Sequence, residues 1–215
     1  MDFSDISHLL FDHDGVLVET EYWYFKATQR GFAELGIDLP LEGYRQHLVD
    51  GRSNWDIPRE QGVLEEDIIA ARESRDRYYQ HYLKTEDINI KGVEDALATL
   101  TRHFHMAIIT TSKRQDFNLI HESRNIVPHF DFVLCSGDYP RAKPAPDPYL
   151  TALSQYGADR SQALVIEDSE RGLRSAVSAE ISCITVYNEF TAHQDLSAAA
   201  GHIPDLPALV DLLVR

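Results

Sequence analysis

The chain has 215 residues and a formal net charge of −15 at pH 7, and 43% of its residues are hydrophobic and 26% charged. These proportions are typical of a folded globular protein and exclude a mainly disordered chain. The negative charge disfavours nucleic acid and anionic membrane surfaces as partners, because both would be repelled. No uncharged apolar run approaches the roughly 18 residues of a membrane span. The acidic start of the sequence does not fit a signal peptide, so a cytoplasmic location is expected.

The apolar segments of the sequence predict an α/β fold. Five short segments indicate buried parallel strands: His8–Phe11, Met106–Thr110, Phe132–Cys135, Ala163–Ile166 and Cys183–Tyr187. Helical patterns lie between the later segments, at residues 93–104, 115–124, 147–156 and 170–179. Strands that alternate with helices favour a Rossmann-like parallel sheet with helices on both faces.

Residues 20–91 differ from the rest of the chain, because they contain no convincing strand segment. Apolar and aromatic residues recur there at helical spacing, in the sets Tyr22, Phe25, Phe32, Leu35 and Ile68, Ala71, Tyr78, Tyr82. We therefore expect a helical domain at 20–91, inserted into a sheet domain made of residues 1–19 and 92–215.

Two aspartates follow the first predicted strand, at Asp12 and Asp14. Ligands of open parallel sheets bind beyond the carboxyl ends of strands. Residues two apart in extended backbone share a face, so both carboxylates can point into one site. Gly15 then permits a tight turn. The alternative is a structural turn in which Asp14 and Gly15 only satisfy turn geometry.

A second acidic pair, Glu167 and Asp168, follows the fourth predicted strand. Carboxylate oxygens there suit a hard cation such as Mg²⁺. The alternative is a helix N-cap formed by Asp168 or Ser169.

Hydroxyls and one lysine complete the set of polar segments. Thr110 ends the second predicted strand and Thr111 follows it at a helix start, where hydroxyls and backbone N–H groups can cradle phosphate. Prolines at alternate positions stiffen residues 144–148 and can hold Lys143 in a fixed place. The alternatives are a hydroxyl N-cap and a solvent-exposed loop with an idle lysine.

In their order and spacing, these segments resemble the motifs of the haloacid dehalogenase superfamily of phosphotransferases. Residues 12–17 match the first motif, Thr110 the second, Lys143 the third, and Glu167 with Asp168 the fourth. The helical insert resembles the cap domain of this family in place and size. The phosphoglycolate phosphatase and β-phosphoglucomutase branch is the most similar.

The resemblance implies a role for each of these residues. Asp12 would be the nucleophile that forms an aspartyl-phosphate, and Asp14 would act as general acid and then as general base. Thr110 would bind the transferring phosphoryl group, and Lys143 would pair with Asp12 and the phosphoryl oxygens. The backbone N–H of His13 and the Thr111 segment would contact the phosphate.

The resemblance also implies a magnesium site. Asp12, the backbone carbonyl of Asp14 and Asp168 would hold Mg²⁺, with Glu167 as a ligand or directly behind it. Charge supports this cofactor, because four carboxylates and one lysine repel a phosphate monoester of charge about −2. A divalent cation is needed to offset that repulsion.

The expected function is a phosphatase that acts on a small phosphorylated metabolite, such as a sugar phosphate or a phosphoglycolate-like acid. The acid/base residue Asp14 argues against the dehalogenase and phosphonoacetaldehyde-cleaving branches. A β-phosphoglucomutase-like mutase is the alternative, although its cap lysine is absent near Ser74. An intact Asp12 and Lys143 argue against an inactive binding homologue.

Substrate selectivity is expected to come from the insert. Arg52 lies where relatives place a substrate-facing loop and is a candidate for contacting a second anionic group or sugar hydroxyls. The alternative for Arg52 is a surface arginine without a binding role. Trp23 and Tyr24 of the insert are candidates for lining the substrate cleft, and the alternative for both is a place in the hydrophobic core. A monomer is expected.

Overall fold

The computed structural model describes residues 3–49 and 52–214, and the structural statements below concern those residues. The chain divides into two compact units. The first takes in the chain up to Glu19 and from Asn89 onward, and the second spans Thr20–Ile88. Residues 89–91, which the sequence pattern assigns to the insert, therefore belong to the first unit.

The first unit contains a sheet of six parallel strands in the order β3-β2-β1-β4-β5-β6 among the described residues. The strands are β1 (His8–Phe11), β2 (His105–Ile109), β3 (Phe132–Leu134), β4 (Ala163–Glu167), β5 (Ser182–Val186) and β6 (Gly201–Ile203). The first five lie at the predicted segments, and the expected fold class is confirmed. The edge strand β6 is a strand that the sequence did not indicate, because three residues are too few for a hydrophobic pattern.

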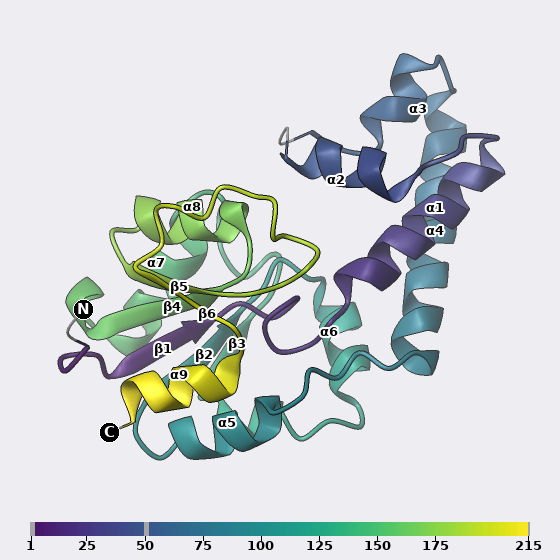
Figure 1. The fold of residues 1–215 in the computed structure, drawn as a ribbon. Helices are drawn as coiled ribbons and strands as arrows, with labels where there is room; N and C mark the ends of the chain where they lie inside the picture. The colour runs from purple at the N-terminus through teal and green to yellow at the C-terminus, as the bar shows by residue number, and fades with distance from the viewer. Residues whose placement is uncertain (1–2, 50–51, 215) are drawn as a thin grey trace. The chain divides into compact units, whose positions relative to one another are not determined.

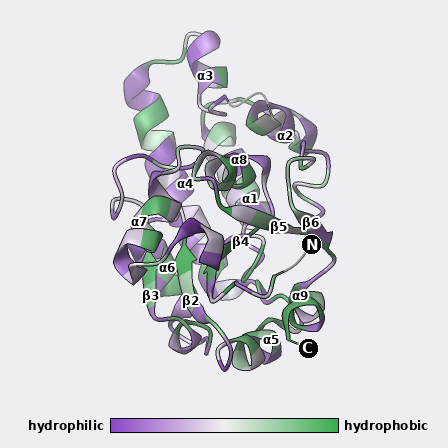
Figure 2. Cartoon of the chain, turned by 90° about the vertical axis from the view of Figure 1, so that its left-hand side faces the viewer, coloured by the Kyte–Doolittle hydropathy of each residue, from purple (hydrophilic) through white to green (hydrophobic). Residues whose placement is uncertain are grey.

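Helices cover both faces of the sheet (Figure 1). α7 (Asp147–Tyr156) and α8 (Glu170–Ser178) lie on one face, and α5 (Val93–Leu100) and α9 (Leu206–Leu213) pack together on the other. Leu10, Val165 and Ile109 belong to the hydrophobic core with α7 and α8. Strands covered on both faces need continuous apolar sequence. Residues Met106–Ile109 of β2 are buried in this way, and β2 is hydrophobic in Figure 2.

The strand order changes direction at β1. The chain runs from β1 to β2 and β3 on one side and then returns to β4 and β5 on the other. Phe11 at the end of β1 is in register with Ile108 of β2 and Ile166 of β4. The residues that follow these three strands therefore meet at a topological switch point, where open α/β sheets bind their ligands.

Polar side chains cap the starts of α8 and α9. Ser169 caps α8 by accepting a hydrogen bond from the Gly172 N–H at 3.1 Å. Asp205 caps α9 in the same way through the Ala208 N–H at 2.9 Å. The remaining helices are α6 (Arg114–His121) and the 3₁₀ turns Val127–His129 and Arg160–Gln162.

The second unit is helical among its described residues. It contains α1 (Glu21–Glu34), α2 (Leu41–Val49), α3 (Asp56–Glu60) and α4 (Glu65–Thr85). α1 and α4 approach closely at Gly31, where a Cβ would lie 2.9 Å from the Ala71 carbonyl oxygen. Trp23 and Tyr24 of α1 contact tyrosines of α4, with ring centroids 5.3 and 5.0 Å apart. None of the helices within 3–49 and 52–214 combines the length and apolar composition that crossing a bilayer requires.

Candidate active site

The loop after β1 positions two carboxylates at the switch point. The Asp12 N–H donates to the Ile166 carbonyl at 2.8 Å, which extends the pairing with β4 to the nucleophile candidate. The chain then turns at Gly15, whose φ is 80° and whose N–H donates to the Val18 carbonyl at 2.7 Å. A Cβ at Gly15 would lie 2.2 Å from Asp168 Oδ2. Glycine is required here for its positive φ and for the close approach of the loop to Asp168.

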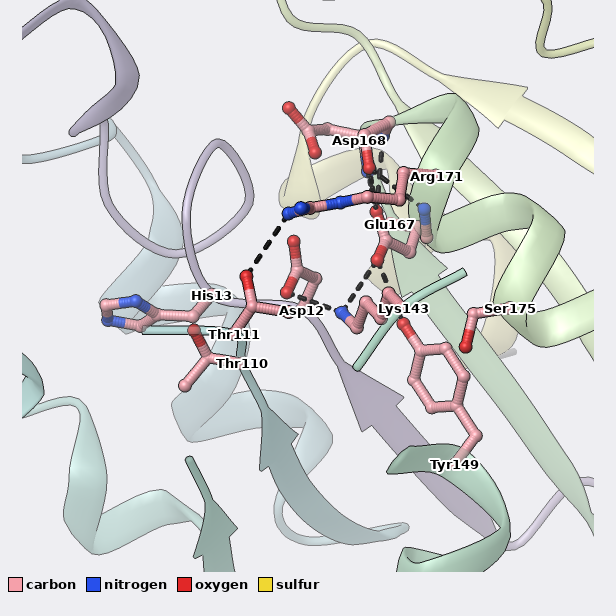
Figure 3. A network of polar contacts seen from close by, with 12 residues as sticks. Asp12, His13, Thr110, Thr111, Lys143, Tyr149, Glu167, Asp168, Arg171 and Ser175 are labelled. Carbon is pink, nitrogen blue, oxygen red and sulfur yellow. Dashed lines mark hydrogen bonds and ion pairs between the residues drawn. The ribbon is translucent and has the colours of Figure 1, made fainter. Parts of the chain in front are cut away.

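Lys143 connects two carboxylates of the site. Its Nζ donates to Asp12 Oδ1 at 2.7 Å and to Glu167 Oε1 at 2.8 Å, and Lys143 itself is only 5% exposed. The Tyr149 hydroxyl also donates to Glu167 Oε1, at 3.0 Å. Figure 3 shows the lysine between the two carboxylates. The predicted fixed lysine is thus a buried one, in direct contact with Asp12.

Burial and charge act against each other in this group. Burial, reinforced by the Glu167 carboxylate, raises the pKa of Asp12 to about 6 although Lys143 opposes the shift. Burial works against the Lys143 ammonium too, but Asp12 and Glu167 outweigh it and raise the pKa of that amine. For Glu167, burial opposes ionisation, whereas Lys143 and hydrogen bonds more than compensate and lower the pKa. Lys143 therefore stays charged, while Asp12 is easier to protonate than an ordinary aspartate.

The Glu167 carboxylate is enclosed by the turn from β4 to α8. Its Oε2 accepts hydrogen bonds from the Asp168 N–H at 3.1 Å and from the Ser169 N–H and hydroxyl at 3.2 and 3.0 Å. A Cβ at Gly172 would lie 1.6 Å from Glu167 Oε1. Both oxygens of Glu167 are therefore occupied by protein donors, and the carboxylate has no room to move toward α8.

Three donors converge on one oxygen of Asp14. The hydroxyl of Ser112 donates to Oδ2 at 2.7 Å and that of Thr110 at 3.3 Å, while His13 Nδ1 lies 3.2 Å from the same atom. The buried His13 ring also meets His121, with their Nε2 atoms 2.9 Å apart. Figure 3 shows the His13 side chain directed away from Asp12. The predicted site residue Thr110 therefore contacts Asp14, and so does Ser112, which was not predicted.

The segment after β5 supports Asp168. The Thr191 hydroxyl donates to the Asp168 carbonyl oxygen at 2.8 Å and lies 3.4 Å from Oδ2. The Asn188 amide donates to the Gly15 carbonyl oxygen at 3.5 Å. Asn188 and Thr191 were not predicted as site residues. Both lie in the segment that follows β5, which ends at Val186, so the rule that ligands bind beyond strand ends points to this segment.

The acidic residues form a set of oxygen donors that fits a divalent cation. Asp12, Glu167 and Asp168 each offer a carboxylate oxygen, and these atoms lie within 4.8 Å of one another. An all-oxygen set of this kind suits a hard cation such as Mg²⁺. The glycine at position 15 keeps the space next to Asp168 free of a side chain.

Two further predicted residues make contacts outside the carboxylate cluster. The Thr111 hydroxyl accepts a hydrogen bond from Arg171 Nη2 at 3.2 Å. Arg52, in the second unit, is exposed and its guanidinium pairs with Glu60. The substrate-binding roles of His13, Thr111 and Arg52 remain predictions.

The parallel sheet and the carboxylate site at its switch point define an α/β enzyme of the Rossmann-like class. Residues 9–186 match the family described as haloacid dehalogenase-like hydrolase. The chain belongs to this family, and the expectation of a hydrolase of this family is confirmed.

Known proteins and a solved structure resemble the chain over most of its length. Protein CbbY of Rhodobacter capsulatus is 31% identical over 95% of both chains. The phosphorylated carbohydrates phosphatase of Thermotoga maritima is 26% identical over 82% of both chains. A crystal structure of a CbbY variant from Rhodobacter sphaeroides in complex with xylulose-(1,5)bisphosphate superposes with a TM-score of 0.79, at 25% identity, and covers 94% of this chain and 95% of that one.

Proposed function

We propose that the protein is a Mg²⁺-dependent phosphatase that hydrolyses a small phosphorylated metabolite through an aspartyl-phosphate on Asp12. The observation that carries this proposal is the contact of buried Lys143 with Asp12, next to the acid pair Glu167 and Asp168. The phosphatase from Thermotoga and the bisphosphate bound to a CbbY variant favour a phosphorylated sugar as the substrate class.

Each step of the proposed reaction uses a residue of this site. Asp12 attacks the phosphorus atom while the bond to the leaving oxygen breaks, and Asp14 donates a proton to that oxygen. Asp14 then takes a proton from the water that attacks the aspartyl-phosphate, which releases phosphate and restores Asp12. Thr110 and Ser112 hold Asp14 in place for both transfers. Lys143 stays positively charged throughout and offsets charge on the phosphoryl oxygens.

Asp12, Asp168 and the Asp14 backbone carbonyl would hold Mg²⁺, with Glu167 behind them as the anchor of Lys143. When bound, the cation supplies positive charge that stabilises the transferring phosphoryl group. Glu167 is suited to the anchoring role because Lys143, Tyr149 and the turn after β4 already occupy its oxygens.

Phosphate release from a panel of phosphorylated sugars and acids tests the proposed function. With Mg²⁺, we expect turnover of at least one sugar phosphate. With a chelator, we expect turnover to fall by about 100-fold or more and to return when Mg²⁺ is restored, because the carboxylates otherwise repel the substrate. Turnover that persists in the chelator would contradict the metal requirement. Conversion of a sugar 1-phosphate to its 6-phosphate without phosphate release would instead support the mutase.

Binding of Mg²⁺ should depend on pH because the cation and a proton compete for Asp12. The pKa of Asp12 is raised to about 6, so this carboxyl is neutral below pH 6 and must lose its proton before a cation binds. Calorimetric titration should therefore show Mg²⁺ affinity falling by about tenfold per pH unit below 6, and changing little between pH 7 and 8. An affinity that is constant from pH 5 to 8 would contradict the competition.

The helical unit Thr20–Ile88 is proposed to select the substrate, as caps of this family do, with Arg52 as a contributor. Replacing Arg52 by alanine is the direct test. A larger loss of kcat/KM on the best sugar phosphate than on an aryl phosphate would support this role.

A further inference from the structure

Arg171 crosses the carboxyl edge of the sheet. It lies in the first turn of α8, three residues after Asp168. Its Nη2 donates to the Thr111 hydroxyl, which belongs to the segment after β2, at 3.2 Å. Figure 3 shows the guanidinium extended from α8 toward Thr111. The Asp12 carboxylate points to the same side of the sheet edge. Arg171 thus joins the two segments that flank the site.

The charge of Arg171 is not neutralised by a carboxylate. Its side chain is exposed, and within 3–49 and 52–214 its hydrogen bond goes to a neutral hydroxyl and no acidic group lies at ion-pair distance. Other arginines of the same unit are engaged, since Arg114 pairs with Asp138 and Arg141 with Asp147. The chain has a net charge of −15, so a positive group at the edge of the site stands out from its surroundings. The guanidinium of Arg171 is such a group, and its other N–H donors are available to a ligand.

Lys143 cannot serve a second anionic group. Both of its contacts are carboxylates, and its side chain is 2% exposed. Arg52 pairs with Glu60 within the second unit. A guanidinium, by contrast, binds a carboxylate or phosphate through two parallel hydrogen bonds. Arg171 therefore has both the chemistry and the free donors for a second oxyanion.

We infer that Arg171, oriented by Thr111, binds a second oxyanion of the substrate, so that the preferred substrates are phosphomonoesters that carry another phosphate or a carboxylate. This inference rests on the proposed phosphatase function and names the substrate class of that site. The group that Arg171 recognises is an oxyanion, which is either a phosphate or a carboxylate. The experiment below distinguishes these two.

Two matched pairs of substrates isolate the second anion. Xylulose 1,5-bisphosphate and xylulose 5-phosphate differ by one phosphate, and phosphoglycolate differs from 2-hydroxyethyl phosphate by its carboxylate. For the wild type, kcat/KM should be higher for the member that carries the second anionic group in one of the pairs, which identifies the source. Arg171→Gln should reduce that preference by about 10- to 100-fold, because charge-assisted hydrogen bonds are lost. Arg171→Lys, which keeps the charge without the planar fork, should retain part of the preference.

Arg174→Gln is the matched control, since it removes the same charge from the next turn of α8, where Arg174 approaches Glu170. We expect this variant to change the preference by less than about threefold. An equal loss of kcat/KM on both members of each pair in Arg171→Gln would overturn the inference, and so would an unchanged preference.

Binding separates this inference from the proposed function. Calorimetric titration of the same four compounds into an Asp12→Asn background, with and without Arg171→Gln, measures the preference without turnover. If the wild type releases no phosphate but the ligand with the second anionic group still binds more tightly in an Arg171-dependent way, the phosphatase proposal fails and the anion site stands. If phosphate is released but neither binding nor turnover depends on Arg171, the anion site fails and the phosphatase proposal stands.

Discussion

Replacing Asp12 by asparagine should lower kcat by about 10⁴-fold or more, which is the scale on which nucleophile deletions act. Asparagine has nearly the shape of aspartate and its amide oxygen can still accept the Lys143 hydrogen bond, but it forms no aspartyl-phosphate. Phosphate release at saturating substrate measures this effect. Acid-quenched wild-type enzyme should also carry a phosphoryl adduct, detectable by mass spectrometry, that the variant lacks.

Folding provides the control for this variant. The pKa of Asp12 is raised from 3.8 to about 6, so the unfolded chain loses this proton at lower pH than the folded protein does. The cost of ionising Asp12 in the metal-free folded protein therefore accumulates between about pH 4 and 6 and is fully present above pH 6. In a chelator at pH 7, the Tm of Asp12→Asn should equal or exceed that of the wild type. A variant that keeps more than a tenth of the wild-type turnover would remove Asp12 from the nucleophile role.

Replacing Gly172 by alanine should cost about 4 kcal/mol in the free energy of unfolding, within the range for overpacking combined with loss of a buried ion pair. The added Cβ would lie 1.6 Å from Glu167 Oε1 and 1.8 Å from Cδ. Glu167 is fully buried and held by Lys143 and Tyr149, so it cannot turn aside without leaving the lysine. Urea denaturation followed by circular dichroism gives the loss of stability, and phosphate release should fall with it.

Gly43→Ala is a matched control, because Gly43 also lies within a helix. A Cβ there meets its nearest neighbour, Pro40 Cγ, at an ordinary 3.6 Å. This substitution should stabilise the protein by up to about 1 kcal/mol, since alanine has the lower entropic cost in a helix. If Gly172→Ala destabilised the protein no more than Gly43→Ala, the enclosure of Glu167 by α8 would be disproved.

The features that could be predicted from the sequence are those that depend on neighbouring residues. Asp12 and Glu167 were identified because each stands where an apolar strand ends, and the parallel sheet brings such ends together. α9 could also have been identified, since Asp205 followed by Pro207 is a typical helix start. Strand β6 could not, because its residues form no hydrophobic pattern and it pairs only along β5.

Contacts between distant residues could not be predicted. Tyr149 has the spacing of a core aromatic in α7, and only the packed structure brings its hydroxyl to Glu167. His13 meets His121, which lies 108 positions further along the chain, so no local pattern signals the pair. The structure also adds groups that orient the polar residues at the strand ends, such as Ser112, whose hydroxyl donates to Asp14.

The place of β1 in the sheet has a consequence for synthesis on the ribosome. β1 leaves the ribosome first, yet its partners are β2 and β4, and β2 begins only at His105. Translation proceeds at about 5–20 residues per second, so the apolar residues Leu9–Phe11 wait several seconds for a partner. The contiguous segment Thr20–Ile88 emerges during that interval and contains its own helices and aromatic contacts. The nascent chain therefore has a helical unit able to form early. Strand β1, which Asp12 follows, depends on the later half of the chain and is exposed to chaperones and to aggregation until then.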